Sequence, residues 1–315
     1  MKPRLLEHLV CPQTGDPLDL VIREERHGEI KEGELVNRLA GHRYPISNYV
    51  PRFVDVDTYA GSFSKQRLYV QRHFRYYRDN ASAAALFHRT TGLCEEDLTK
   101  GLTLEVGCGY GRFIDVVERE RGEVVGIDLS THSIELAQSF VGLRENVHLI
   151  QCDLFRLPFR KETFKTIYSI GVLHHTPDSG RAFSAMVNYL SPGGRLSIWV
   201  YPPEDQANVK VWRRFTSRWP TSWLYAFCIL NQVAFSWIRI IPVVRWRFNR
   251  LIPGSVPARG RPFWNRVLED FDNLSPQYAS THTPEDVMQW FREAGLRRVR
   301  SLDRRTSVTG VKLPA

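Results

Sequence analysis

The fold of this chain is decided by residues 102–111, which read LTLEVGCGYG. A short apolar run at 102–106 leads into three glycines at alternate positions, Gly107, Gly109 and Gly111. Glycine tolerates positive φ and lets a ligand approach the backbone closely, so the pattern predicts a strand that turns into a helix beside a bound ligand. Proteins that bind dinucleotides place their third glycine one residue later, so the spacing argues against that class.

Three acidic residues mark the ends of successive predicted strands. Glu105 lies two residues before the first glycine, where it would repel a pyrophosphate and attract an ammonium group. Asp128 follows a strand at 123–127, and a carboxylate there can accept both ribose hydroxyls, which contributes roughly 1.5–3 kcal/mol. Asp153 follows a strand at 148–151 and is placed to accept from an adenine amino group, with Leu129 and Leu154 on the two faces of the ring. As structural alternatives, Asp128 would cap the next helix and Asp153 would serve only a turn.

Short apolar runs alternate with amphipathic patterns through this region, which is typical of a parallel sheet with crossover helices. We predict strands at 102–106, 123–127, 148–151, 164–170 and 195–200, and helices at 112–121, 133–141 and 179–190. Later, a helix at 284–294 begins with the capping signal Thr283-Pro284 and precedes strands at 298–302 and 307–313. The pattern predicts an α/β, doubly wound sheet.

These motifs closely resemble the class I S-adenosylmethionine-dependent methyltransferases of the type 11 branch, over residues 102–200. The resemblance includes the loop LHHTPD at 173–178 and the segment SPGG at 191–194. It implies a seven-stranded Rossmann-like sheet with a reversed last strand and S-adenosyl-L-methionine across the carboxyl ends of the strands, with no metal. It also implies that Glu105 and the three glycines line the methionine and ribose, that Asp128 holds the ribose and that Asp153 reads the adenine.

Two histidines, His174 and His175, follow the strand at 164–170, on the side that faces the transferred methyl group in this family. Imidazole titrates near neutrality, so each is a candidate general base or acceptor clamp. His175 aligns with the histidine most often found in this loop of the family. The structural alternative is that both only brace the loop. Tyr278 and His282 are further candidates to reach the acceptor.

Residues 1–57 form a separate region of short predicted strands and turns. The stretches at 5–12 and 44–53 are similar to the small zinc-ribbon domain that is fused to, or activates, several methyltransferases. A zinc ribbon needs four Cys or His ligands, but only Cys11 stands at such a position and Thr14 replaces the second cysteine. We therefore expect a degenerate zinc-ribbon-like domain without metal, in which Cys11 is a buried apolar residue. Residues 58–101 are predicted to be a helical linker or cofactor lid, and 102–315 the methyltransferase domain.

Residues 206–262 interrupt the alternating pattern and carry ten Lys and Arg but no Asp or Glu. The net charge of the chain is +9, so its basic character is confined to this segment. The segment also holds five tryptophans and a stretch without charge at 219–238. Polar residues inside that stretch make it a poor membrane-spanning helix. We predict a helical insert that is either a lid over the acceptor or a peripheral membrane contact.

The sequence therefore predicts methyl transfer to a small-molecule or lipid-like acceptor. Five scattered cysteines without a C-x-x-C pair, and no recognisable signal peptide, favour a cytoplasmic location, with peripheral attachment to a membrane as a second expectation. An RNA methyltransferase is an alternative, favoured by the charge and the N-terminal domain. Apolar residues thread the basic insert, which makes nucleic acid the less favoured partner. A non-catalytic cofactor-binding scaffold is the third reading, and the intact set of acids argues against it.

Overall fold

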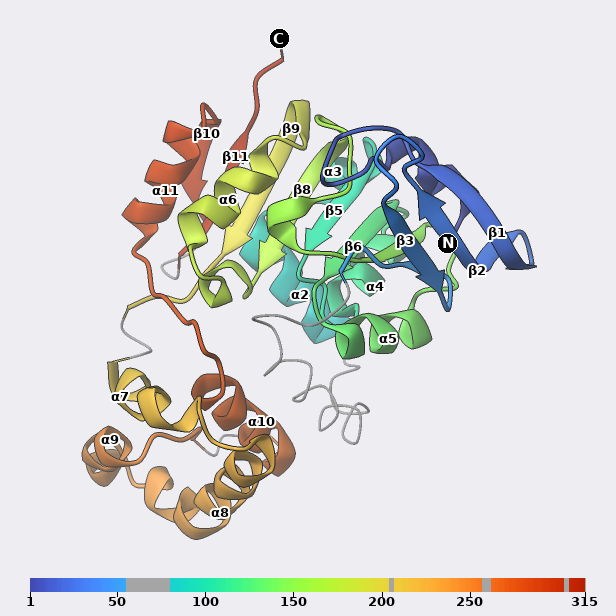
Figure 1. The fold of residues 1–315 in the computed structure, drawn as a ribbon. Helices are drawn as coiled ribbons and strands as arrows, with labels where there is room; N and C mark the ends of the chain where they lie inside the picture. Colours follow the sequence, from blue (N-terminus) through green and yellow to red (C-terminus); the bar gives the residue numbers. More distant parts are fainter. Residues whose placement is uncertain (55–79, 204–206, 257–261, 303–305, 315) are drawn as a thin grey trace.

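The computed structural model describes residues 1–54, 80–203, 207–256, 262–302 and 306–314. Figure 1 shows three parts: a small N-terminal sheet, a large central sheet flanked by helices, and a group of helices set apart from both. The predicted boundary at 57, and the part of the predicted helical linker at 58–79, lie outside the described residues.

The central sheet has seven strands in the order β10-β11-β9-β8-β5-β6-β7. The strands are β5 (Thr103–Val106), β6 (Val124–Asp128), β7 (Val147–Gln151), β8 (Phe164–Ile170), β9 (Leu190–Trp199), β10 (Arg297–Ser301) and β11 (Ser307–Val311). β5 to β9 pair in parallel, whereas β11 runs antiparallel to both of its neighbours. The predicted doubly wound sheet with a reversed last strand is confirmed.

The segment SPGG differs from its prediction as a turn before a strand at 195–200. β9 already begins at Leu190, and its pairing with β8 shifts register between Phe164 and Thr166. Within this irregular stretch Gly193 has a φ of 74°, in the left-handed region that glycine adopts more easily than other residues. Gly193 donates to the carbonyl oxygen of Lys312 at 2.9 Å, and Lys312 donates back to that of Gly194 at 2.9 Å. Backbone groups from the far end of the chain therefore hold the segment in the sheet.

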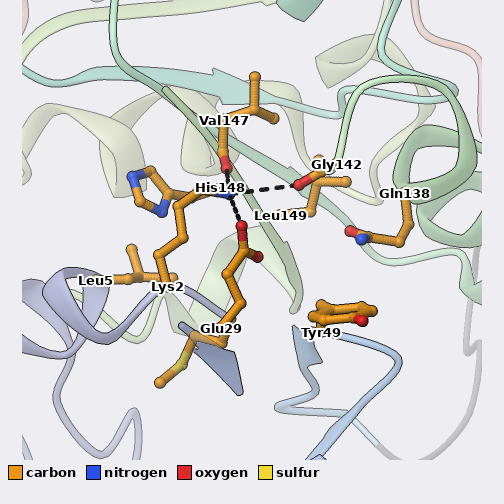
Figure 2. A pocket seen from close by; sticks show the side chains of 10 residues that line it. Lys2, Leu5, Glu29, Tyr49, Gln138, Gly142, Val147, His148 and Leu149 are labelled. Atoms are coloured by element: carbon orange, nitrogen blue, oxygen red, sulfur yellow. Dashed lines mark hydrogen bonds and ion pairs between the residues drawn. The ribbon is translucent and has the colours of Figure 1, made fainter. Parts of the chain in front are cut away.

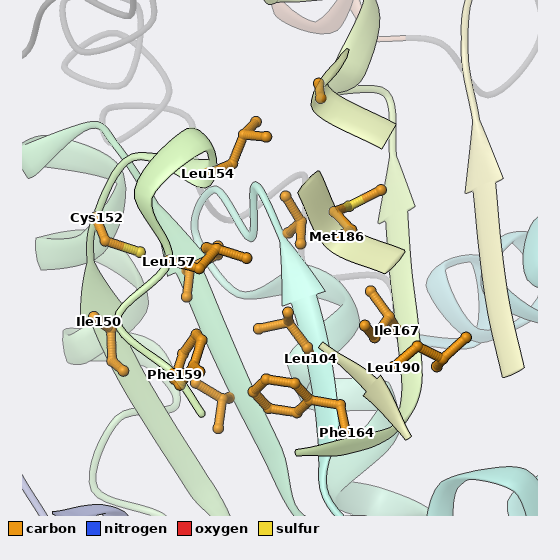
Figure 3. Close-up of a cluster of buried hydrophobic side chains, with 14 of the residues drawn as sticks. Leu104, Ile150, Cys152, Leu154, Leu157, Phe159, Phe164, Ile167, Met186 and Leu190 are labelled. Atoms are coloured by element: carbon orange, nitrogen blue, oxygen red, sulfur yellow. The ribbon is translucent and has the colours of Figure 1, made fainter. Parts of the chain in front are cut away.

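Helices cover both faces of the central sheet (Figure 1). The helices α2 (Asn80–Thr91), α3 (Glu95–Thr99), α4 (Arg112–Arg119) and α5 (Thr131–Phe140) pack on one face, and α6 (Ser179–Val187) and α11 (Pro284–Glu293) on the other. Figure 3 shows part of the core on the second face, where Leu104 and Phe159 lie among the side chains of the strands and Met186 comes from α6. The predicted start of α11 is confirmed, because Thr283 and Asp286 cap each other's backbone amides.

The N-terminal domain is a four-stranded antiparallel meander that follows the 3-10 helix η1 (Pro3–His8). Its strands are β1 (Asp19–Arg26), β2 (Glu29–Val36), β3 (Arg43–Ser47) and β4 (Val50–Pro51). Directly after β4, Phe53 donates its backbone N–H to the carbonyl oxygen of Gln151 at 2.8 Å. Arg52 pairs in parallel with the same residue. The N-terminal domain thus covers the edge strand β7, which would otherwise leave backbone groups unpaired.

Lys2 adds a buried electrostatic contact between the two sheets (Figure 2). Its Nζ lies 3.2 Å from a carboxylate oxygen of Glu29 in the N-terminal domain. It donates to the carbonyl oxygens of Val147 at 2.9 Å and Gly142 at 3.4 Å, both in the central domain. A buried ammonium group needs such partners to offset the loss of its hydration, so this contact constrains how the domains meet.

Cys11 is fully buried in the apolar core, as predicted, and it also contacts polar side chains. Its Sγ lies 3.2 Å from the hydroxyl of Tyr44, and beside it Asn37 donates to the hydroxyl oxygen of Thr14 at 2.9 Å. Burial raises the pKa of Cys11, but hydrogen bonds from Asn37, Thr14 and Tyr44 outweigh it and lower the pKa to about 7. Hydrogen-bonded side chains thus lie beside Cys11, at the position where the zinc-ribbon resemblance predicts a ligand.

The set-apart helices form a module with its own core (Figure 1). They are α7 (Ala207–Thr216), α8 (Thr221–Ile240), α9 (Pro242–Leu251) and α10 (Phe263–Leu274). The predicted helical insert is confirmed, but α10 extends it beyond residue 262. Leu224 and Cys228 of α8 pack against Val267, Phe271 and Leu274 of α10. The apolar face of α10 therefore packs against another helix of the insert, and α10 is part of the insert.

Candidate active site

The glycine turn between β5 and α4 adopts the backbone that its sequence predicts. Gly107, Gly109 and Gly111 have φ values of 77°, 55° and 85°, in the left-handed region that favours glycine. A Cβ on Gly107 would lie 2.4 Å from a methyl carbon of Val172. The loop after β8 therefore packs directly against the glycine turn, which brings the two halves of the predicted site together.

Asp128, the last residue of β6, braces this turn. Its carboxylate accepts from the backbone N–H of Gly109 at 2.9 Å and from that of Ser130 at 2.8 Å. The helix α5 is capped by Ser130, whose hydroxyl accepts from the N–H of Ser133. The alternative role of Asp128 as the helix cap is therefore wrong. The two backbone donors fix the orientation of a carboxylate at the carboxyl end of the sheet.

Asp153 follows β7 and caps the 3-10 helix η3 (Leu154–Arg156), where it accepts from the N–H of Phe155 at 3.0 Å. Beside it lies a cavity of about 430 Å³, whose walls include Asp153, Phe155, Arg181 and, from the N-terminal domain, Phe53. Leu129 and Leu154 are both buried, at 8% and 6% exposure. The carboxyl ends of β6 and β7 thus bring together the four residues predicted for the ribose and adenine.

Glu105 lies in β5 and is 2% exposed. Tyr168 of β8 donates its hydroxyl to a carboxylate oxygen of Glu105 at 3.0 Å. Burial, together with the negative charge of Asp128, raises the pKa of Glu105 well above its usual value. A cation at the glycine turn would offset both effects, because an opposite charge favours the ionised carboxylate. Glu105 and Asp128 fit the predicted contacts to the ammonium group and the ribose of S-adenosylmethionine. Their individual roles stay predictions.

The histidine pair lies in the 3-10 helix η4 (Leu173–His175) at the carboxyl end of β8. The ring of His174 is fully buried and stacks on Tyr201, with centroids 3.8 Å apart. Neither ring nitrogen of His174 has a hydrogen-bond partner among the residues that the structure describes. The ring of His175 lies 4.1 Å from that of His174, and its Nδ1 donates to the carbonyl oxygen of Tyr278 at 3.0 Å. The neutral ring of His175 therefore carries its lone pair on Nε2.

Both imidazoles are held neutral at ordinary pH. Burial lowers the pKa of His174 well below its usual value, and the charges of His175, His282 and Arg213 add to the effect. Burial also lowers the pKa of His175 to about 4, although the hydrogen bond to Tyr278 acts to raise it. Neutral imidazole can accept a proton or a hydrogen bond, so the site is suited to an acceptor with a hydroxyl or amino group.

The segment at 273–282 crosses over the histidines. Ser280 donates its N–H to the carbonyl oxygen of His174 at 2.9 Å, and His282 donates likewise to that of Tyr201 at 3.0 Å. Arg213, a buried residue of α7, donates from Nε to the carbonyl oxygen of Asn273 at 2.9 Å. The first helix of the insert therefore holds this segment in place. Of the predicted acceptor residues, His282 and the backbone of Tyr278 both lie here.

Tyr201 and Arg213 were missed as site residues in the sequence. Tyr201 follows β9 closely, and its position near the carboxyl end of a parallel strand is a signal that could have found it. Arg213 has no such signal, because it is one of ten basic residues in its segment. As for metals, the described parts of the chain contain no group of three or more His, Cys, Asp or Glu side chains that could hold an ion.

Known proteins match both sheets of this chain. The family described as "Methyltransferase domain" matches residues 104–198, and that described as "Trm112p-like protein" matches residues 2–48. Methyltransferase GfsG of Streptomyces halstedii is 31% identical over 231 residues, which cover 69% of this chain and 80% of GfsG. A probable tRNA methyltransferase 9B of Bos taurus is 31% identical over 134 residues, 42% of this chain but only 28% of that relative.

Among solved structures, an S-adenosylmethionine-dependent methyltransferase from Mesorhizobium loti matches with a TM-score of 0.46 and 18% identity, over 74% of this chain and 100% of that one. The similarity to GfsG extends over most of both sequences, and the methyltransferase match spans the glycine turn and the strand-end acids. We conclude that the chain is an enzyme of the S-adenosylmethionine-dependent methyltransferase family, with S-adenosyl-L-methionine as its cofactor.

Proposed function

We propose that the enzyme methylates a small-molecule or lipid-like acceptor that binds beside His174, His175 and Tyr201. The observation that carries this proposal is the neutral histidine pair, in which His174 is fully buried and has two ring nitrogens that no described residue satisfies. A buried polar atom without a partner is costly, and an acceptor hydroxyl or amine would supply the missing hydrogen bond. The ring of Tyr201, which stacks on His174 and lies edge-on to His175, favours an organic acceptor with apolar surface.

The other end of the site holds the cofactor in this proposal. S-adenosyl-L-methionine supplies the methyl group from its sulfonium sulfur. Asp128, oriented by two backbone donors, accepts from the ribose hydroxyls. Asp153 accepts from the adenine amino group, Leu129 and Leu154 flank the ring, and Glu105 pairs with the methionine ammonium. Gly107 allows the close approach, because a larger residue would strike Val172.

His175 acts on the acceptor in this proposal. A pKa of about 4 makes it a weak base. It therefore orients the acceptor through Nε2 and takes its proton only as the new bond to the methyl carbon makes that proton acidic. Its hydrogen bond to the carbonyl oxygen of Tyr278 sets the ring direction. Positioning is the main requirement, because transfer from a sulfonium is an in-line displacement that needs aligned atoms.

RNA is the second candidate acceptor. The match of residues 2–48 to the Trm112p-like family, the likeness to tRNA methyltransferase 9B and the basic insert favour it. Large apolar side chains exposed on the same insert disfavour it, because RNA-binding surfaces combine basic residues with a few stacking aromatics. Membership in an enzyme family argues against the non-catalytic scaffold.

The acceptor class is tested by incubating the enzyme and radiolabelled cofactor with cell extract, then separating lipid, nucleic acid, protein and small-molecule fractions. We expect label in the lipid or small-molecule fraction with the wild-type enzyme, and much less of it with Asp128→Ala when the cofactor concentration is limiting. Label confined to RNA would replace the proposal by the RNA alternative. We also propose a cytoplasmic location with peripheral membrane contact through residues 206–262, which cell fractionation would test.

A further inference from the structure

The helical module exposes an unusual amount of apolar surface. Of the sixteen large hydrophobic side chains that are exposed in the described chain, eleven lie between Val211 and Leu251. A soluble protein scatters such residues singly, whereas a concentration on one element marks an interaction surface. Five of them lie on α8 and define what we call the α8 stripe: Trp223, Leu230, Val233, Trp237 and Ile240, each between 63% and 70% exposed.

The α8 stripe forms one face of the helix. Its members follow one another at intervals of seven, three, four and three residues, and such intervals keep side chains on one side of an α-helix. The other side of α8 is buried, where Leu224, Cys228 and Asn231 face the interior of the module. The helix is therefore apolar on its outer face while its inner face is already packed.

α8 is long and apolar enough to cross a membrane, by length and composition only. Its inner face argues that it does not. Asn231 and Gln232 donate to the carboxylate of Asp270 in α10, at 3.3 and 2.7 Å. Arg239 is fully buried and donates to the side-chain oxygen of Asn231 at 2.8 Å. Insertion across a bilayer would break this network and place its polar groups in hydrocarbon, which is strongly unfavourable.

The exposed charges on the chain before and after α8 indicate what covers the stripe. Arg214 and Arg218 are exposed before α8 begins, and Arg247 is exposed in α9 after it ends. The acidic residues of the module, Glu269, Asp270 and Asp272, all lie on α10, and α7, α8 and α9 contain none. A second copy of the α8 stripe would therefore meet it with like charge. An anionic lipid surface offers complementary charge, with about 1 kcal/mol for each basic residue close to it. Trp223 and Trp237 suit the boundary between headgroups and acyl chains.

From these contacts we infer that the α8 stripe docks the enzyme on an anionic bilayer surface, with α8 lying in the plane of the interface. The inference rests on the proposed membrane contact of the insert, which it assigns to one face of one helix, and it does not depend on the proposed acceptor chemistry. Docking would also bear on the active site, because Arg213 of the same module holds the segment at 273–282 over the histidines. The module would thus orient the acceptor site relative to the membrane.

The test is co-sedimentation of the full chain with vesicles of phosphatidylcholine alone or with added phosphatidylglycerol. We expect wild type to bind the anionic vesicles about tenfold or more tightly than the neutral ones, and less tightly at high salt. Leu230→Gln/Val233→Gln, which changes only outward-facing side chains, should lose about tenfold of this binding. The matched control is Leu39→Gln/Leu143→Gln, which alters two apolar residues outside the module that are at least as exposed, and it should bind as wild type.

Calorimetric binding of S-adenosylhomocysteine to each variant verifies folding and leaves the acceptor out of the measurement. Equal binding of wild type to both vesicle types, or unchanged binding of the stripe variant, would overturn the inference. So would a dimer in sedimentation velocity that the stripe variant dissociates, because a second copy would then cover the stripe. None of these results would change the labelled acceptor fraction, so docking and the proposed acceptor fail separately.

Discussion

The ring of His174 stacks on the ring of Tyr201, with centroids 3.8 Å apart and planes inclined by 26°. His174 follows β8 and Tyr201 follows β9, so the stack joins the carboxyl ends of two neighbouring parallel strands. His282 binds the backbone of Tyr201, and Ser280 binds that of His174. Three stretches of the chain thus meet around two neutral imidazoles, on the side of the glycine turn where Val172 packs.

The first prediction concerns His175. His175→Asn should lower kcat roughly a hundredfold, because it removes a positioned proton acceptor. The affinity for S-adenosylhomocysteine should stay unchanged, because the cofactor residues lie after other strands. Steady-state kinetics and calorimetry measure the two effects. His27→Asn is the control, since His27 is exposed in the N-terminal domain at φ 53°, a backbone that Asn also adopts. An unchanged kcat in His175→Asn would mean that His174 and His175 only support the loop and take no part in the reaction.

A second prediction concerns Asp128. Asp128→Ala should weaken cofactor binding by about 2 kcal/mol, on the order of thirtyfold, because a charge-assisted contact to the ribose is lost. Calorimetry with S-adenosylhomocysteine provides the measurement. Asp286→Ala is matched to it, because Asp286 also accepts from a backbone N–H, that of Thr283 at 2.8 Å, but caps α11. This control should lose stability and keep its affinity. Equal affinities in the two variants would show that Asp128 is only structural.

The buried ion pair at the domain junction leads to a third prediction. Lys2→Met should lower the free energy of unfolding by about 3 kcal/mol, because Glu29 and two carbonyl oxygens lose a buried partner. Urea denaturation followed by circular dichroism would show the change as a lower midpoint. Lys161→Met, at an exposed lysine, should leave the midpoint near that of wild type. A common midpoint for both variants would mean that the contact contributes nothing to stability.

Stability should also depend on pH through His148. Burial lowers its pKa to about 4, although the hydrogen bond to Glu123 opposes the shift. Between about pH 6.5 and pH 4 the unfolded chain binds a proton at this residue that the folded chain does not. Stability is therefore lost as pH falls through this window, by on the order of 3 kcal/mol. His148→Gln cannot titrate, so its unfolding free energy should fall less between pH 7 and pH 4.5. Parallel pH curves for the two proteins would refute the assignment.

The last prediction concerns zinc. The purified protein should contain no stoichiometric zinc, because Cys11 has Tyr44, Asn37 and Thr14 around it where a ribbon has further ligands. Elemental analysis after purification without added metal tests this. One zinc ion per chain would restore an intact metal site and overturn the degenerate-ribbon interpretation.

Much of the central sheet and the cofactor side could be predicted because their signals are local. The glycines at 107–111 and the acids at the ends of β6 and β7 lie in, or within a few residues of, the strands that position them. Parallel strands bring their carboxyl ends to one edge, so a strand-end residue has a predictable place. The start of α11 was equally predictable, because a capping box is complete within four residues.

The acceptor side could not be derived in this way. Arg213 reaches Asn273 across 60 residues, and nothing in its own segment separates it from nine other basic residues. The SPGG segment is held in the sheet by backbone hydrogen bonds to Lys312, more than a hundred residues later. That α10 is part of the insert is visible only from its packing on α8.

By itself, the sequence determined the methyltransferase sheet, the identity of the cofactor and the uneven charge, since these follow from short-range patterns of backbone preference and strand-end chemistry. Only the tertiary structure decided which segment covers the histidines and which face of α8 stays exposed. Both depend on contacts between residues far apart in the chain. Such contacts bury one group of apolar side chains and leave another group of similar composition exposed to water.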